Sequence, residues 1–303
     1  MKPVALLPAG EKQLPVATLL YFMLKELYRF VSPKFQNLFL DYKVNFEPRY
    51  GHGKPPHQPL YDLINRHRDT YRGLLTNILT YQPVFERIKD AKAETDPNQP
   101  TWNNAFLPGL DIVAIYGMLA HFHPAQYVEV GSGNSTKVAA KAIRDQGLST
   151  QITSIDPYPR AEIDSLAQRV VRKPFEETDF SFLYGLKAND ILFIDNSHRV
   201  LPNSDATVFF LEVLPRLASG VIVHIHDIYL PYDYPQFMCD RAYSEQYLLA
   251  AFILANPDKY ETILPNYFIS QDSELSGILN PLWQQPALQG VETHGGSYWL
   301  RVN

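Results

Sequence analysis

Residues 127–143 read YVEVGSGNSTKVAAKAI, and this stretch decides the fold. Residues 127–130 are a short apolar run rich in β-branched residues, which predicts a strand. A break containing Gly131 and Gly133 follows, and from Ser135 onward the composition is typical of a helix. Glycines let a ligand approach the backbone closely, and the first turn of a helix offers free N–H groups. The stretch therefore predicts a strand, a ligand-binding turn and a helix.

A second predicted strand strengthens this interpretation. Residues 152–156 read ITSID, an apolar run that ends in the acid Asp156. In a doubly wound sheet, a carboxylate at this point accepts hydrogen bonds from ribose hydroxyls. Glu129, the last polar residue of the first strand, is expected beside the same ligand. Ser135 and Thr136 stand where a dinucleotide fingerprint has its third glycine, so the pattern favours a nucleoside-bearing ligand without a pyrophosphate.

These residues carry a family resemblance. The pattern Glu129-x-Gly131-x-Gly133, Asp156 and the later strand ends at Asp195 and Asp227 resemble a class I S-adenosylmethionine-dependent methyltransferase. More narrowly, the chain is similar to a bacterial group with YVEVGSGNST, a strand ending in IDxSH, a strand ending in HxHD and a following LPYDYP. The resemblance extends from about Tyr50 to the C-terminus and does not imply a substrate. It implies S-adenosylmethionine as cofactor, bound by Glu129, Gly131, Gly133, Ser135, Asp156 and Asp195.

Length and composition limit the remaining choices. The 303 residues fit about two domains, or one α/β core with a helical extension. A net charge of -5 gives no nucleic-acid footprint, so we expect a small-molecule partner. The single cysteine, Cys239, excludes an internal disulfide and favours a cytoplasmic location. No run of about 20 apolar residues predicts a membrane span. Residues 14–31 predict an amphipathic helix that packs on the core or on a dimer partner, the alternative being a membrane surface.

The chain changes character near residue 105. Residues 1–105 predict a helical N-terminal lid or dimerisation region, with helices at 17–31 and 59–89 and a linker at 91–100. Residues 106–303 predict the S-adenosylmethionine-binding domain, beginning with a helix that Asp111 can cap. Strands are expected at 127–130, 152–155, around 170, and at 191–194, 221–226, 260–264 and 297–302. Helices are expected between them at 135–145, 160–168, 205–217 and 242–255.

This alternation predicts an α/β protein with a mainly parallel sheet covered on both faces. Seven strands is the number in the Rossmann-like fold of class I methyltransferases. The resemblance further implies that the last strand is antiparallel.

Two predicted strand ends carry groups suited to chemistry. The first is the end of the strand at 191–194. Related O-methyltransferases have a metal-binding carboxylate at this position and, in some members, a basic side chain after it. The resemblance thus implies Asp195 as a metal ligand that also orients the acceptor, and His198 as general base. An imidazole can accept a hydroxyl proton near neutral pH. His226 and Asp227 end the next strand, where metal-dependent relatives have an acidic pair or Asp-Asn, so a divalent ion held by Asp195, His226 and Asp227 is the corresponding expectation. His226 argues against Mg²⁺, because imidazole suits Zn, Fe, Ni or Mn better than Mg²⁺.

The substrate is expected to contact three segments outside the cofactor motif. The first, YGHGKPPH at 50–57, combines glycines and prolines with polar side chains and is typical of a lid. The second segment, around residues 102–104, offers an aromatic side chain and an amide. The third is the tyrosine-rich stretch after Asp227. The predicted substrate residues are Tyr50, His52, Lys54, His57, Trp102, Asn104 and Tyr232.

The function predicted from the sequence is O-methylation of a hydroxyl on a small molecule such as a sugar, polyol or phenol. Two other classes stay open at this point. His198, His226 and Asp227 would also meet the two-histidine, one-carboxylate pattern of a metal-dependent oxygenase or hydrolase. A non-catalytic nucleoside-binding scaffold, dimerised through its helical region, is the third alternative.

Overall fold

The computed structural model describes residues 16–159 and 162–303. Internal contacts divide the chain into two compact units, Met1–Asn45 and Phe46–Asn303. In the first unit, α1 (Val16–Val31) forms the helix predicted at 17–31. The first two residues of the predicted amphipathic stretch, 14 and 15, lie outside the described residues.

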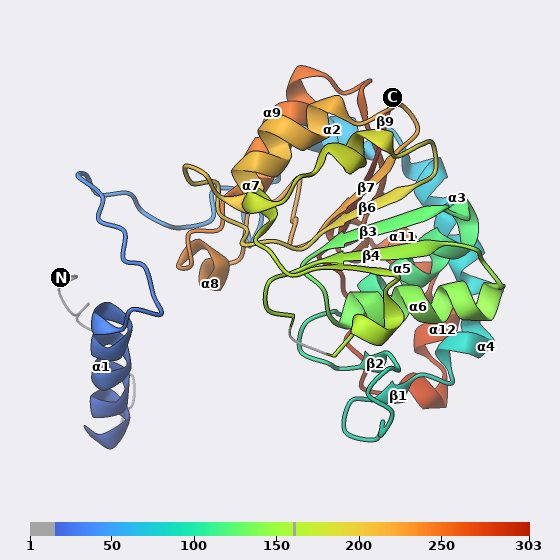
Figure 1. Cartoon of the computed structure of the whole chain (residues 1–303), viewed down its shortest axis with the longest axis horizontal. Coiled ribbons are helices and arrows are strands. Elements are labelled where there is room, and N and C mark those ends of the chain that lie inside the picture. The colour runs from blue at the N-terminus through green and yellow to red at the C-terminus, as the bar shows by residue number, and fades with distance from the viewer. Residues whose placement is uncertain (1–15, 160–161) are drawn as a thin grey trace. The chain divides into compact units, whose positions relative to one another are not determined.

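The second unit contains a seven-stranded sheet (Figure 1). Its strands follow the order β5-β4-β3-β6-β7-β9-β8. β9 pairs antiparallel with both β7 and β8, and the other pairs are parallel, which confirms the predicted architecture. The strands are β3 (Gln126–Val130), β4 (Gln151–Ile155), β5 (Arg169–Val171), β6 (Ile191–Ile194), β7 (Ile222–Ile225), β8 (Tyr260–Pro265) and β9 (Tyr298–Val302).

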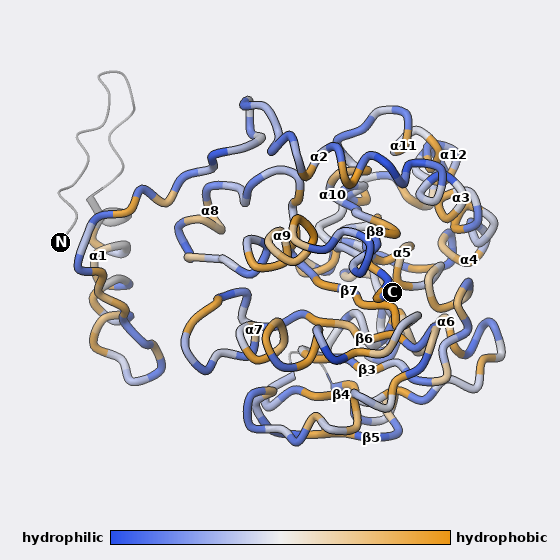
Figure 2. Tube along the Cα trace, turned by 90° about the horizontal axis from the view of Figure 1, so that it is seen from above, coloured by the Kyte–Doolittle hydropathy of each residue, from blue (hydrophilic) through white to orange (hydrophobic). Residues whose placement is uncertain are grey.

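The central strands are apolar because helices cover both faces of the sheet (Figure 1). All four residues of β6 are buried, as are all four of β7. Hydrophobic segments gather along the central strands and on α5 in the second unit, while many of the outer loops are hydrophilic (Figure 2). The longest helices around the sheet are α3 (Arg68–Leu79), α5 (Gly109–Phe122), α6 (Asn134–Gln146) and α9 (Glu245–Ala255).

The region predicted as one helical stretch at 59–89 forms three helices. Shorter elements complete the unit, and α7 continues through a π-helical and a 3₁₀ turn over the predicted 205–217. These elements are α2 (Gln58–Asn65), α4 (Gln82–Phe85), β1 (Lys89–Asp90), β2 (Thr101–Trp102), α7 (Asp205–Val208), α8 (Gln236–Cys239), α10 (Asn266–Gln271), α11 (Ser273–Gly277) and α12 (Asn280–Trp283), with short helical turns at Asp164–Leu166, Phe175–Glu177, Ser181–Gly185, Phe209–Val213, Leu214–Arg216 and Pro286–Leu288.

Two local predictions are corrected by the structure. The helix expected at 160–168 is absent from its described part, where only a 3₁₀ turn, Asp164–Leu166, forms; residues 160 and 161 lie outside the described residues. Asp111 does not cap α5, because Pro108 holds the N-cap position and Asp111 lies inside the first turn. The predicted linker at 91–100 forms turns between the paired strands β1 and β2.

Within residues 16–159 and 162–303, every helix is too short or too polar to cross a membrane. Cys239 is a free, buried thiol that packs against Tyr234, Met238 and Tyr243.

Candidate active site

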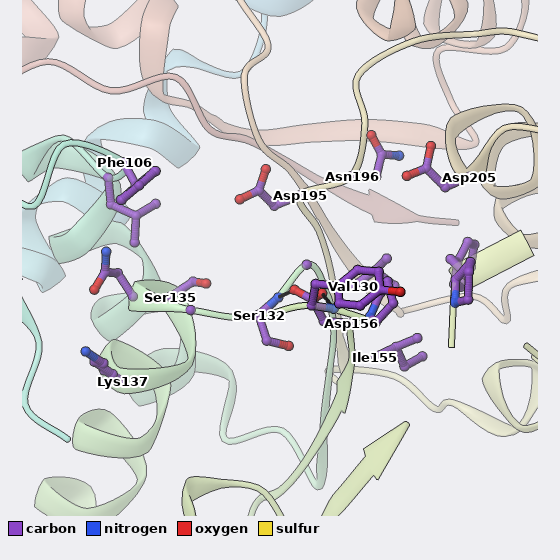
Figure 3. Close-up of a pocket in the computed structure, with 18 of the residues that line it drawn as sticks. Phe106, Val130, Ser132, Ser135, Lys137, Ile155, Asp156, Asp195, Asn196 and Asp205 are labelled. Atoms are coloured by element: carbon purple, nitrogen blue, oxygen red, sulfur yellow. Dashed lines mark hydrogen bonds between the residues drawn. The ribbon is translucent and has the colours of Figure 1, made fainter. Parts of the chain in front are cut away.

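The loop between β3 and α6 forms the floor of a cavity of about 570 Å³ at the carboxyl ends of the strands (Figure 3). Gly131 adopts φ +82°, a left-handed conformation that favours glycine, and a side chain there would collide with the backbone oxygen of Asp195. Gly133 is different, because no atom lies within 4 Å of the position of an added Cβ. Gly131 thus brings the loop against the end of β6, and Gly133 leaves space for a ligand.

Glu129 lies beneath this loop and is fully buried. It accepts a hydrogen bond from the hydroxyl of Thr136, whose oxygen also accepts from the N–H of Gly133 at 3.1 Å. Burial raises the pKa of Glu129 to about 8, against hydrogen bonds from Ser135 and Thr136 that lower it. Its second oxygen has no partner among the described residues. Glu129 therefore supports the loop from below and is not among the residues that line the cavity.

Asp156 follows β4 directly and lines the cavity. One carboxylate oxygen accepts from the N–H of Ser132 at 2.8 Å, and the other accepts from the N–H of Tyr158 at 2.7 Å. Each oxygen has a second lone pair for a ligand hydroxyl. The carboxylate thus joins the glycine loop to the end of the neighbouring strand.

The cavity is lined by the predicted residues Ser135 and Asp195 and by others that the sequence did not indicate. Phe106 and Ser135 lie on one side of the loop in Figure 3, while Asn196 and Asp205 lie on the other, with Asp195 between them. Apolar groups and one lysine add to the lining: Leu107, Lys137, Ile155, Pro157, Tyr158, Pro174 and Phe175. No sequence pattern identifies Phe106, Asn196 or Asp205 as lining residues, because only the fold brings their segments together.

Beside this cavity, the ends of β6 and β7 bring two acids and two histidines into a closed ring. His198 Nε2 lies 3.3 Å from Asp195 Oδ1 and 3.6 Å from Asp227 Oδ2. His226 Nδ1 lies 3.7 Å from Asp195 Oδ1 and 3.7 Å from Asp227 Oδ1. Carboxylate and imidazole therefore alternate around the ring, as expected for polar groups that end adjacent parallel strands.

Two residues of the ring have a left-handed backbone conformation. His198 has φ +61° and Asp227 has φ +54°. Such left-handed conformations cost free energy for residues other than glycine and persist where the surrounding structure enforces them. Both residues belong to the ring, so the surrounding structure holds its two sides in these conformations.

Each histidine of the ring contacts a further carboxylate on its other nitrogen. His198 Nδ1 lies 2.5 Å from Oε1 of Glu245, the first residue of α9. Burial alone would lower the pKa of His198, but Glu245 and Asp195 raise it to about 10. His198 is therefore protonated at neutral pH in the unliganded site.

His226 has a corresponding partner in Asp111, 3.4 Å from its Nε2. Asp111 is fully buried and accepts hydrogen bonds from the amide of Asn266 and the N–H groups of Gly296 and Ser297. Burial opposes the charged form of His226, yet Asp227 and Asp195 raise its pKa well above the ordinary value. Burial likewise disfavours ionised Asp195, but the two imidazoles hold its pKa below the ordinary value.

The predicted metal site is not found in the part of the chain that the structure describes. There, no group of three or more His, Cys, Asp or Glu side chains is arranged to hold a metal ion. The predicted ligands Asp195, His226 and Asp227 contact one another as ion pairs instead. His224, which precedes His226 by two residues and lies in β7, is buried. Its Nε2 is 2.7 Å from the hydroxyl oxygen of Ser297, and its ring stacks on Phe193.

The predicted lid segment lies against the tyrosine-rich stretch, outside the cavity lining. His52 Nε2 is 2.9 Å from the backbone oxygen of Asp233, and Tyr232 packs over Gly51. The N–H of His57 donates to the oxygen of Pro231 at 2.9 Å, and its ring caps α2.

The other residues of this predicted segment are also engaged within it. The ring of Tyr50 meets the ring of His57 at 4.9 Å. The Lys54 ammonium donates to the oxygen of Pro48 at 2.6 Å. These contacts order the segment, and none of its four predicted substrate residues lines the cavity of the glycine loop.

Trp102 and Asn104 have structural contacts. Trp102 is buried and meets Trp283 edge to face at 6.4 Å. The amide of Asn104 donates to the oxygen of Thr101, and its oxygen accepts from the N–H groups of Phe106 and Leu107. Asn104 therefore shapes the loop that carries two residues of the cavity wall.

Comparison with known proteins places this site in a recognised domain. Residues 128–228 match the family model described as a methyltransferase domain. No curated protein matches the chain. Among solved structures, a Podospora anserina methyltransferase with bound S-adenosylhomocysteine is 14% identical, with a TM-score of 0.39, over 84% of this chain and 100% of that one.

An O-methyltransferase from Bacillus cereus is 13% identical over 82% of this chain and 96% of that one, with a TM-score of 0.37. A plantazolicin methyltransferase is 14% identical over 94% of this chain and 99% of that one, with a TM-score of 0.40. The family match covers β3, the glycine loop, Asp156 and the ends of β6 and β7, which are the parts that build the site. On that match, residues 128–228 belong to a methyltransferase domain, which here forms part of a sheet of this strand order.

Proposed function

We propose that the enzyme transfers the methyl group of S-adenosylmethionine to a hydroxyl oxygen of a small molecule, with His198 as the proton acceptor. The observation that carries this proposal is the ring of Asp195, His198, His226 and Asp227 beside the cavity of the glycine loop. Asp195 belongs to both, so an acceptor on the ring would lie next to a cofactor in the cavity. Such alignment supplies much of the rate of a displacement reaction.

The cavity lining suits S-adenosylmethionine. Gly131, Gly133 and Ser135 would lie along its amino-acid part, where the open space at Gly133 and the start of α6 accept a carboxylate. Asp156 would accept from the ribose hydroxyls. Glu129 would act through the loop that it supports.

In the proposed reaction, the acceptor oxygen attacks the methyl carbon while the sulfur–carbon bond breaks. The electron pair of that bond stays on sulfur, which gives S-adenosylhomocysteine, and the hydroxyl proton passes to Nε2 of His198. His198 must first be neutral to accept it. An acceptor bound between His198 and the carboxylates of Asp195 and Asp227 would separate these charges from the imidazole, which favours the neutral form. Among the described residues, no three His, Cys, Asp or Glu side chains are arranged to hold a divalent ion, so no step is assigned to a metal.

The acceptor class is tested by incubating the full-length protein with S-adenosylmethionine and matched probes. Phenol, catechol, glucose and myo-inositol offer hydroxyls, while aniline and glucosamine add amines. Mass spectrometry measures S-adenosylhomocysteine and the position of the new methyl group. The proposal expects oxygen-linked products from the hydroxyl probes. Methylation confined to the amine nitrogen would contradict it.

We also propose that residues 1–105 serve as a lid and dimerisation region of the domain at 106–303. Packing of the 50–57 segment on the stretch after Asp227 supports the lid function. In α1, Leu20, Leu24, Leu27 and Val31 follow the spacing of a coiled-coil seam, and all four are at least half exposed.

Leu24→Glu is expected to convert a homodimer into a monomer, because it places a charge in this apolar seam. Light scattering of the eluted full-length protein measures the mass. Lys25→Glu, which changes the charge of the next residue on the polar side of α1, is the control and should leave the dimer intact. A monomeric wild-type chain would contradict the proposal.

A further inference from the structure

Glu245 is fully buried, and its carboxylate has one hydrogen-bond partner among the described residues. Its Oε1 lies 2.5 Å from Nδ1 of His198, and its Oε2 has no hydrogen-bond partner among the described residues. Asp111, the buried acid beside His226, is held by Asn266 and two backbone N–H groups. Burying a charge is costly unless it is paired, so His198 alone compensates the burial of Glu245.

The surrounding structure fixes the orientation of His198. The N–H of Ser244, the residue before Glu245, donates to the backbone oxygen of His198 at 2.9 Å. The imidazole stacks on the ring of Tyr243, with centroids 4.6 Å apart. With Nδ1 directed at Glu245, Nε2 faces the ring acids Asp195 and Asp227. The start of α9 therefore sets which nitrogen reaches the crevice.

We propose that Glu245 is a positioning residue for methyl transfer: it accepts the Nδ1 proton of His198 and keeps Nε2 directed at the acceptor. This inference rests on the proposed function of His198. A proton held on Nδ1 leaves the lone pair of neutral histidine on Nε2, where the acceptor hydroxyl would lie. Once Nε2 has taken that proton, the Glu245 carboxylate stabilises the resulting imidazolium, as the acid of a catalytic triad does.

Several other charged groups surround His198. Asp195 faces it from the end of β6 and Asp227 from the end of β7. Two cations lie near Tyr243, the ring on which His198 stacks: the guanidinium carbons of Arg199 and Arg241 are 5.4 and 4.6 Å from its centroid.

His226 faces the same two ring acids as His198. Glu245 is the acid nearest to His198, so its loss should change the pKa and tautomer of the imidazole most.

The test is nitrogen NMR of the full-length protein, labelled in histidine and saturated with S-adenosylhomocysteine. The His198 signals are identified by their loss in His198→Gln. In Glu245→Gln, we expect the titration midpoint of His198 to fall by about one pH unit or more, because one adjacent negative charge is removed. Neutral His198 should also lose its fixed Nδ1–H tautomer. Glu261→Gln, at a half-exposed acid near Arg301, should leave both unchanged.

Turnover gives a second readout. With a hydroxyl probe that the enzyme methylates, Glu245→Gln should lower kcat by about tenfold or more and leave the affinity for S-adenosylhomocysteine unchanged. An unaltered titration and tautomer of His198 in folded Glu245→Gln would overturn the inference. If Glu245→Gln does not fold, Glu245→Asp replaces it, and unaltered His198 signals and kcat in that variant would have the same meaning.

The inference and the proposed function can fail separately. Full turnover by His198→Gln, together with an altered His198 titration in Glu245→Gln, would remove His198 as the base but leave Glu245 as the group that orients it. The NMR readout therefore does not depend on the identity of the acceptor.

Discussion

His198→Ala is expected to lower turnover by about 10²- to 10⁴-fold, the usual contribution of a general base. Affinity for S-adenosylhomocysteine should stay close to wild type, because His198 is not part of the cavity lining. The measurement is the initial rate with a hydroxyl probe that the wild type methylates, beside a calorimetric titration. His121→Ala, at an exposed histidine in the last turn of α5, is the control and should keep full activity.

The pH profile gives this expectation a sign. His198 accepts a proton only when neutral, and Glu245 and Asp195 raise its pKa to about 10. In the wild type, kcat/KM should therefore rise with pH between 7 and about 10 and level off above. His198→Ala should lose this rise. Unchanged turnover in His198→Ala, or a wild-type rate that falls over the same range, would show that another group takes the proton.

Gly131→Ala is expected to have the largest effect on the cofactor site. Its methyl group would collide with the backbone oxygen of Asp195, and the φ of +82° adds strain for a residue with a side chain. The loop must shift, at a cost of about 3 kcal/mol in unfolding free energy. Affinity for S-adenosylhomocysteine should fall by about tenfold or more. Thermal unfolding and calorimetric titration measure the two effects.

Gly147→Ala separates the two causes. Gly147 ends α6 with a similar φ of +62°, but an added Cβ meets no atom within 4 Å. This control should lose about 1 kcal/mol of stability from the backbone conformation and no cofactor affinity. If Gly131→Ala behaves like Gly147→Ala, the close approach to Asp195 has no importance for the site.

The order of strands and helices could be predicted because local patterns carry it. The buried run ILFI at 191–194 and the glycine break after Val130 are visible without knowledge of the fold. The grouping of Asp195, His198, His226 and Asp227 could also be anticipated, since adjacent parallel strands end at one edge of the sheet. The helix predicted at 160–168 is longer than the turn that forms at Asp164–Leu166, because composition alone does not set where a helix begins and ends.

The carboxylates behind the ring could not be predicted as partners of the histidines. Asp111 stands near the start of the otherwise apolar helix α5, and Glu245 begins the apolar helix α9. A single acid in such a position resembles an ordinary charge in the first turn of a helix. The only signal was that both helices are apolar on every side, which indicates burial of whatever polar group they contain.

The substrate residues show the opposite difficulty. Tyr50, His52, Lys54 and His57 looked functional because polar groups stand between glycines and prolines. In the structure these groups bind neighbouring backbone and rings, and Tyr232 packs on the same segment. A polar loop that satisfies its own hydrogen bonds has the same composition as one that binds a ligand, so sequence alone does not separate them.

The most direct test of the methyltransferase account is calorimetric titration of the full-length protein with S-adenosylhomocysteine. We expect one binding site per chain with micromolar affinity. Asp156→Ala should weaken binding by about tenfold or more, because it removes the proposed acceptor for the ribose hydroxyls and the bond to the N–H of Ser132. Asp164→Asn, at an acid outside the cavity lining, should bind like the wild type. Absence of binding by the folded wild type, or equal binding by Asp156→Ala, would contradict the account.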